Sequence, residues 1–194
     1  MDFANTVYDP NEPAGSLRSW NDLVDFLEAV GAKNRSDANR LRYMNIHNPR
    51  GCSKALAHTM VLRDSLRKVF ASIEAKKGIP LEWIMAINVV LRSNEGYKRL
   101  VRTKAGWDLR FDMRREEPLQ VLVCVARSAA KLIEQGLNAP VRKCGNPNCL
   151  LYFYDVSRTR RRRWCSMAIC GNRMKVAAYA RRNRERKGMQ KKLQ

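Results

Sequence analysis

The sequence predicts a mostly α-helical (α+β) protein: a helical N-terminal domain that contains one β-hairpin, and a small C-terminal module that holds four cysteines and a basic helix. Three observations support this fold class. Apolar residues recur at helical spacing in several segments of the first 137 residues. Two short alternating runs meet at a Lys-Ala-Gly turn, which is typical of a hairpin. Four cysteines and most of the excess positive charge lie near the C-terminus.

Composition supports a folded protein that binds a polyanion. Hydrophobic residues make up 45% of the 194 residues, enough for a core and too many for wholesale disorder. The formal net charge is +20, and a surface of this kind attracts polyanions. The charge is concentrated at one end, since the segment from Arg142 onward has sixteen Lys and Arg against two acids.

The sequence gives no sign of membrane insertion or export. No apolar run approaches the ~18 residues that span a bilayer. The opening "MDFANTVYDP" is polar and acidic, unlike a signal peptide. We therefore expect a cytoplasmic, nucleoid-associated protein, in which cysteines bind metal or remain free more readily than they form disulfides.

The first helices are marked by capping signals. Segment 16–31 has a capping box of Ser19 with Asp22 and a stop at Gly31. Segment 36–46 predicts a shorter helix that ends before Asn48-Pro49. The apolar stripe of the first helix is Trp20, Leu23, Val24, Leu27 and Val30.

The clearest helical pattern covers 53–78, with Ser53 as its cap and Gly78 as its stop. Pro80 opens the next helix, which is apolar on nearly all sides and is expected to be buried. A hairpin over 97–113 and a helix over 117–136 complete the body. The predicted organisation is a body at 1–137, a linker at 138–143, a cysteine module at 144–187 and a basic tail at 188–194.

Four cysteines have the spacing of a metal site: Cys144, Cys149, Cys165 and Cys170 form C-x4-C, fifteen residues, and C-x4-C. Two tight turns that each present two thiolates can surround a tetrahedral zinc ion. "CGNPNC" consists of turn formers between its cysteines. The strand-like segment between the two pairs would supply a small core of Leu150, Leu151, Phe153 and Val156. We therefore predict one structural Zn²⁺.

Other interpretations of the cysteines remain open. They include four unrelated buried thiols, two disulfides, and a catalytic zinc site, which would keep an open coordination position. His47 and His58 are far from the cysteines in sequence and are interpreted as surface or packing residues. Arginines 160–163 would favour thiolate and offset the charge of the site, and those in excess would face outward.

The C-terminal segment predicts a helix that binds nucleic acid. Met174, Ala177 and Ala178 would face the cysteine module, while bases lie on both flanks and could reach phosphates. Tyr179 either contacts a base or packs. The candidate contact residues are Arg158, Arg160, Arg161, Arg162, Arg163, Arg173, Lys175, Arg181, Arg182 and Arg184.

The segment "CGNPNCLLYFYDVSRTRRRRWCSMAICGNRMKVAAYARR" closely resembles the CGNR zinc finger, whose name matches Cys170 to Arg173. The first 140 residues more loosely resemble the ABATE domain, through "DFANT" and a helix containing Trp20. The resemblance implies a bacterial stress-induced transcription regulator, with zinc on the four cysteines and duplex DNA on the finger. We expect structural roles for Asp155, Trp164 and Asn172, the last as a helix cap.

Two other function classes are considered. An RNA-binding or ribosome-associated zinc protein would have the same charge pattern. An enzyme is not expected, because the body has no nucleophile elbow, glycine-rich phosphate loop or paired catalytic carboxylates. Cys52, just before a helix, is interpreted as incidental. The body could instead bind an effector, with Asn5 and Thr6 as candidates, or form a homodimer through its hairpin or its apolar helix.

Overall fold

The computed structural model describes residues 1–6, 17–113 and 117–192 and divides into two compact units. The body covers residues 2–139, and the C-terminal unit begins at Pro140. Within the described residues, no helix combines the length and the apolar character needed to cross a bilayer. The last two residues of the predicted basic tail lie outside the described part of the chain.

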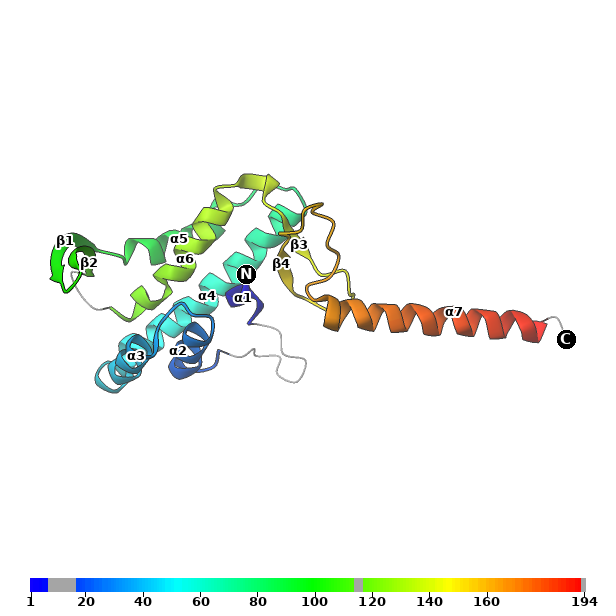
Figure 1. Ribbon diagram of the computed structural model, residues 1–194, viewed down its shortest axis with the longest axis horizontal. Helices are drawn as coiled ribbons and strands as arrows, with labels where there is room; N and C mark the ends of the chain where they lie inside the picture. The colour runs from blue at the N-terminus through cyan, green and yellow to red at the C-terminus, as the bar shows by residue number, and fades with distance from the viewer. Residues whose placement is uncertain (7–16, 114–116, 193–194) are drawn as a thin grey trace. The chain divides into compact units, whose positions relative to one another are not determined.

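The body is built of helices around one long central helix (Figure 1). Its elements are α1 (Asp2–Asn5), α2 (Trp20–Ala29), α3 (Arg35–His47), α4 (Pro49–Glu74), α5 (Leu81–Arg92), β1 (Gly96–Thr103), β2 (Gly106–Met113), η1 (Pro118–Leu122), α6 (Val123–Ile133) and η2 (Gly136–Asn138). Helix α4 contacts α1, α2, α3 and α5 and both short 3-10 helices. Its buried face, predicted from the helical spacing, carries Leu62, Leu66, Val69, Phe70 and Ile73.

The capping box at the start of α2 is confirmed. Ser19 Oγ accepts the N–H of Asp22 at 3.1 Å, and Asp22 Oδ2 accepts the N–H of Ser19 at 2.7 Å. The side chains of the predicted stripe are buried from Trp20 to Leu27, whereas Val30 at the C-terminal cap is exposed. The stripe thus ends where the helix does.

Two expectations for the body were wrong. Helix α4 begins at Pro49 rather than near Ser53, because Asn48 Oδ1 accepts the N–H of Gly51 at 3.0 Å and proline suits the first helical turn. Helix α5 is not buried all round: it packs on α4 and α6 with only part of its surface. Ile87 and Val90 are buried, while exposed apolar positions include Leu81, Met85 and Val89.

The predicted hairpin is present. Strands β1 and β2 pair antiparallel, with Thr103 opposite Gly106 across the Lys104-Ala105 turn. Gly106 adopts a φ of +127°, a conformation that favours glycine.

The C-terminal unit has little regular structure before its long helix. It contains β3 (Val141–Lys143), β4 (Tyr152–Tyr154), the π-helical segment η3 (Met167–Gly171) and α7 (Asn172–Lys192). Strands β3 and β4 pair antiparallel. Strand β3 thus occupies the end of the segment assigned to the linker, because Val141 to Lys143 pair with Tyr152 to Tyr154. The predicted small core is reduced to buried Phe153 and half-buried Leu151; Leu150 and Val156 are exposed.

Candidate metal centre and basic surface

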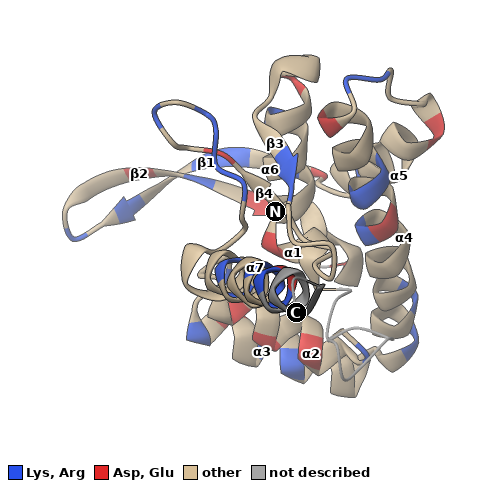
Figure 2. Ribbon diagram, turned by 90° about the vertical axis from the view of Figure 1, so that its right-hand side faces the viewer, with Lys and Arg blue, Asp and Glu red and all other residues tan. Residues whose placement is uncertain are grey.

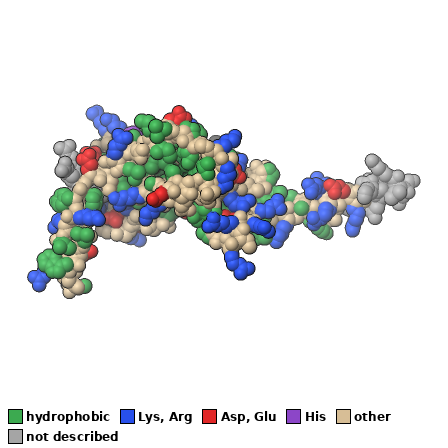
Figure 3. Space-filling view, turned by 90° about the horizontal axis from the view of Figure 1, so that it is seen from above, with side chains coloured by type: hydrophobic (Ala, Val, Ile, Leu, Met, Phe, Trp, Pro, Cys, Tyr) green, Lys and Arg blue, Asp and Glu red, His purple; other side chains and the backbone are tan. Residues whose placement is uncertain are grey.

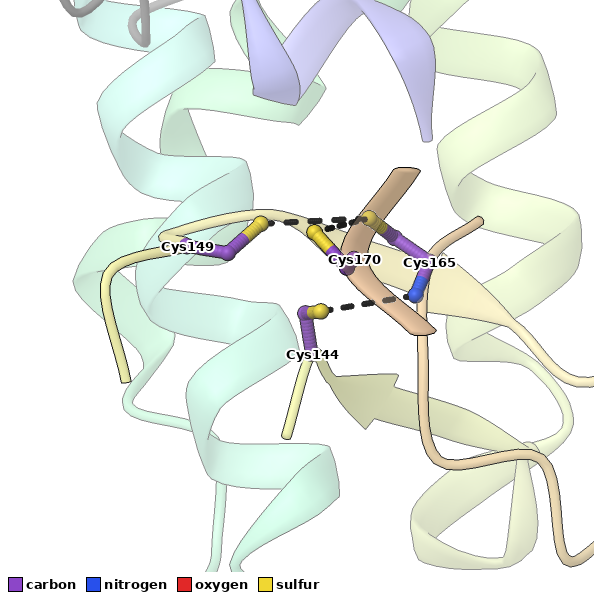
Figure 4. Close-up of side chains that lie close together, drawn as sticks. All are labelled: Cys144, Cys149, Cys165 and Cys170. Atoms are coloured by element: carbon purple, nitrogen blue, oxygen red, sulfur yellow. Dashed lines mark hydrogen bonds between the residues drawn. The ribbon is translucent and has the colours of Figure 1, made fainter. Parts of the chain in front are cut away.

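The four cysteine sulfurs converge, as the spacing predicted. The thiols come from short segments: Cys144 directly follows β3, Cys149 ends the first turn, and Cys170 lies in the π-helical segment η3. All four Sγ atoms lie within 4.8 Å of one another. The Sγ atom of Cys165 is 3.8 Å from that of Cys149 and 3.7 Å from that of Cys170 (Figure 4). A tetrahedron with Zn–S bonds of ~2.3 Å has edges of about 3.8 Å, so the cluster fits one zinc ion.

Nitrogen donors of the chain bond to the cysteine sulfurs. The N–H of Cys165 donates to Cys144 Sγ at 3.4 Å, and Asn146 Nδ2 donates to Cys170 Sγ at 3.5 Å. Burial opposes ionisation of Cys144, but backbone N–H donors from Cys165 and Asn146 outweigh it and lower the pKa of this thiol. Burial raises the pKa of Cys149 and Cys165. A divalent cation supplies the charge that would keep four thiolates together.

Trp164 lies against the glycines that follow the first and last cysteines. A Cβ on Gly145 would stand 3.1 Å from the Cζ3 atom of Trp164, and a Cβ on Gly171 would stand 3.1 Å from its Cδ1 atom. The N–H of Gly145 also donates to the carbonyl of Arg163 at 2.8 Å. The indole therefore links both cysteine turns, which supports the structural role expected for Trp164.

The arginine loop, defined as residues 157–163, is held by Asp155. The side chain of Asp155 is almost fully buried. Its Oδ1 accepts the hydroxyl of Ser157 at 2.5 Å, and its Oδ2 accepts the N–H of Arg162 at 3.0 Å. The Ser157 hydroxyl contributes most to lowering the pKa of Asp155. The carboxylate thus spans the loop and fixes both ends, in agreement with the structural role expected for it.

The arginines of the loop have different surroundings. The guanidinium of Arg162 lies 5.0 Å from the ring of Phe153 and donates to the carbonyls of Trp164 and Cys165. The guanidinium of Arg163 lies over Trp164 at 5.0 Å. Arg160 turns the chain with a φ of +48°. Arg158 and Arg161 are exposed. The side chains of Arg162 and Arg163 therefore contact the cysteine module itself. The sequence alone does not distinguish them from Arg160 and Arg161, because all four residues are arginine.

Strand β3 adds bases that the sequence-based list of contacts omitted. Arg142 and Lys143 are exposed, and Arg142 Nη1 donates to the carbonyl of Arg160 at 2.8 Å. This hydrogen bond places Arg142 beside the arginine loop. The predicted strand after Cys149 is the signal that could have indicated this position of Arg142. A strand there needs a partner, and pairing of Tyr152 to Tyr154 with β3 brings the residues before Cys144 into the module.

The start of the basic helix differs from the prediction. Ser166, not Asn172, caps the helical segment: its Oγ accepts the N–H of Ile169 at 3.3 Å. Asn172 is exposed and already helical, because η3 runs directly into α7. Met174 and Ala178 are half-buried, whereas Ala177 is exposed and lines an open groove of about 640 Å³ with Ile169 and Val176.

The remaining predicted bases lie along α7. Arg181 is within 3.8 Å of Glu185, its partner one turn later. Basic and apolar positions are distributed around this helix rather than divided between two faces, and Figure 2 shows Lys and Arg along it. The predicted contact bases of α7 are all exposed, as is Arg186: Arg173, Lys175, Arg181, Arg182 and Arg184.

Candidate residues of the body have local structural roles. Thr6 Oγ1 donates to the carbonyl of Phe3 at 2.7 Å and so closes helix α1. Asn5, the other effector candidate, is half-buried at the end of the same helix. Cys52 is fully buried, and burial raises the pKa of its thiol. A raised pKa disfavours the reactive thiolate.

The fold and the site together define a two-unit helical protein with a C-terminal four-cysteine zinc finger. Residues 141–183 match the CGNR zinc finger. Residues 1–136 match the ABATE family, described as "Putative stress-induced transcription regulator". The chain belongs to the ABATE family and carries a CGNR finger with one structural zinc site. A search of curated proteins found no match.

Proposed function

We propose that this protein is a transcription regulator that binds duplex DNA through its C-terminal finger. The observation that carries the proposal is that the exposed arginines of the loop differ in their hydrogen bonds. The Arg162 side chain bonds to the finger's own carbonyls, whereas the exposed side chains of Arg158 and Arg161 show no such bond within the described residues. A loop fixed by Asp155 and by the metal centre presents these guanidinium groups without further ordering.

The charge around the loop supports a polyanionic partner. Arg142 lies beside the loop, and the exposed bases of α7 follow in the same unit. Figure 3 shows Lys and Arg side chains at the surface of this unit. Guanidinium groups bind phosphate and guanine edges through two parallel hydrogen bonds, so arginine-rich surfaces suit duplex recognition. A regulator of this kind would act in the cytoplasm at the nucleoid and without enzymatic activity.

The proposal is tested by selecting bound sequences from a random duplex pool with the zinc-loaded full chain. Enrichment of a motif supports sequence-specific DNA binding. Competition with single-stranded and double-stranded RNA of matched length follows in a gel-shift assay. Preference for RNA would replace the proposal with the RNA-binding alternative, and the absence of binding to either polymer would overturn both.

The variant that tests the site is Arg158→Ala with Arg161→Ala. Because both side chains are exposed, zinc content and folding should be unchanged while affinity falls. The matched control removes the same charge from the body, through Arg50→Ala with Lys54→Ala on exposed positions of α4 and its N-terminal turn. Equal losses of affinity in both double variants would indicate nonspecific charge attraction only.

A further inference from the structure

The two faces of the hairpin differ in composition. The register places Leu100 opposite Leu109, Arg102 opposite Trp107, and Lys98 opposite Phe111. Because side chains of directly opposed residues share a face, these residues form one face of the ribbon, with four large apolar residues and two bases. We call its apolar part, which consists of Leu100, Trp107, Leu109 and Phe111, the apolar face of the hairpin.

Ion pairs occupy the opposite face. Arg99 pairs with Asp112, and Arg110 Nε lies 3.1 Å from Asp108 Oδ2. All four residues belong to the alternate set of the register. The ion pairs thus share their face with Tyr97 and Val101, whereas the four largest exposed apolar side chains of β1 and β2 apart from Tyr97 lie on the other face with Lys98 and Arg102.

The apolar face is exposed in the single chain. The exposed fractions are 69% for Trp107, 64% for Leu100, 58% for Leu109 and 40% for Phe111. In Figure 1 the hairpin extends beyond the end of α5. An isolated two-stranded ribbon is marginally stable in water and gains stability from further strands or a covering element. Such a ribbon is suited to association with another surface.

The edge of β2 is complementary to itself. Because Thr103 and Gly106 pair across a two-residue turn, the alternation of antiparallel bonding directs the backbone groups of Trp107, Leu109 and Phe111 to the free edge. An antiparallel pairing of two β2 strands about a twofold axis at Leu109 sets Trp107 opposite the second copy's Phe111. The same register sets Asp108 opposite the second copy's Arg110, twice.

We propose that two copies of this chain associate through their β2 edges, in an antiparallel register centred on Leu109, to form a four-stranded sheet. From Trp107 to Phe111, each cross-copy position then joins apolar to apolar or acid to base. A twofold arrangement is closed, so association stops at the dimer. A sheet of four strands is also more stable than an isolated two-stranded ribbon, which is marginally stable in water.

The edge of β1 is unsuited to the same pairing. Its three charged residues, Lys98, Arg99 and Arg102, are all basic. A register centred on Leu100 would set Lys98 opposite the second copy's Arg102, and like charges directly opposite each other are destabilising. Basic side chains on a strand edge are a common means of preventing association. The charges therefore favour pairing of the two copies through β2 rather than through β1.

The size of the contact predicts a reversible dimer. Two eight-residue strand edges form a small contact surface, and small interfaces are typical of weak, reversible association. The dimer should therefore populate as concentration rises.

The test is sedimentation equilibrium of nucleic-acid-free, zinc-loaded full chain over a range of concentrations. We expect Asp108→Arg to weaken dimerisation roughly tenfold, because two basic groups then face each other at both sites. Arg110→Asp should weaken it similarly by opposing two acids. The double variant, with both changes in one chain, should restore the wild-type mass, since it restores both cross-copy ion pairs.

Recovery of the dimer in the double variant would show that the single variants fail through lost ion pairs and not through loss of folding. Leu109→Lys should abolish the dimer, while Leu100→Lys, the matched change on the same face of β1, should retain it. A monomer at every concentration would overturn the proposal. So would single reversals that leave the mass unchanged, a double variant that fails to recover, or open-ended association, which would indicate head-to-tail pairing of β1 with β2. Binding of other proteins or of vesicles without a dimer would assign the apolar face to that occupant instead.

Discussion

The buried carboxylate of Asp155 accepts the backbone N–H of Arg162 at 3.0 Å and thereby closes the arginine loop. The same carboxylate accepts the N–H of Ser157 at 3.0 Å. One side chain thus sets the conformation of a loop on which several guanidinium groups lie. The exposed side chains of Arg158 and Arg161 depend on this carboxylate for their position, although its hydrogen bonds go to Ser157 and Arg162.

Replacing Asp155 with Asn should therefore weaken nucleic-acid binding indirectly. An amide accepts through one oxygen only, so one end of the loop loses its partner. We expect lower affinity and faster proteolysis within the loop, with one zinc per chain retained. The measurements are gel-shift titration, limited proteolysis and metal analysis. Unchanged affinity and unchanged cleavage would show that the loop does not need this anchor.

Cys165→Ser should release zinc and unfold the C-terminal unit while the body remains folded. Cys165 has two neighbouring sulfurs at 3.7 and 3.8 Å, and a structural site with three thiolates binds zinc more weakly. Metal analysis and circular dichroism check the result. Cys124→Ser is the matched control, because its thiol lies in the body outside the cluster and should leave zinc at one per chain.

Gly145→Ala should destabilise the finger by about 1–2 kcal/mol through overpacking. Its new methyl group would meet both the carbonyl of Arg163 and the ring of Trp164 at 3.1 Å. Faster loss of zinc to a chelator measures the effect. Gly78→Ala adds the same methyl group with no atom within 4 Å and should leave the rate of loss unchanged. Equal rates for all three proteins would contradict close packing of Trp164.

The body should lose stability at acid pH partly through Asp22. Burial opposes ionisation of this carboxyl, but hydrogen bonds from Ser19 and Arg18 outweigh it and lower its pKa. A lowered folded-state pKa gives stability that is complete above the ordinary value of ~3.9 and is lost as pH falls through the shifted pKa. Asp22→Asn should remove this part of the acid dependence. Ser19→Ala should cost about 1 kcal/mol near neutral pH. Unfolding titrations at several pH values check both results.

Salt should weaken DNA binding steeply. If about six phosphates are contacted, log affinity should fall with log salt with a slope near ~−5. Replacing Arg158 and Arg161 with Ala should reduce the steepness by about two, roughly one per phosphate contact. An affinity that does not depend on salt, or a slope that these substitutions leave unchanged, would assign binding to another surface.

Local signals in the sequence predicted much of the fold. The capping box of Ser19 with Asp22 depends on residues three apart, and the apolar spacing of α4 depends on one helix, so both were accessible. The start of α4 was harder to predict, because both Ser53 and Asn48 before Pro49 are capping patterns and the helix begins after the earlier one. Helix α5 shows the limit of composition: an apolar surface does not reveal which side its neighbours cover.

The candidate site was also predictable only in part. Cysteine spacing predicted the cluster, because four thiols in two short turns have few other ways to become buried together. The division among the arginines could not be predicted, because Arg160 to Arg163 are four identical letters. Their surroundings depend on Asp155, Phe153 and Trp164, which meet them only after folding.

Zinc K-edge X-ray absorption on the freshly purified full chain, with parallel metal analysis, tests the central claim most directly. One zinc ion ordering the C-terminal unit predicts one zinc per chain surrounded by four sulfurs at about 2.3 Å. A chain that folds this unit without zinc, or a zinc ion with nitrogen or oxygen in place of one of the four sulfurs, would contradict it.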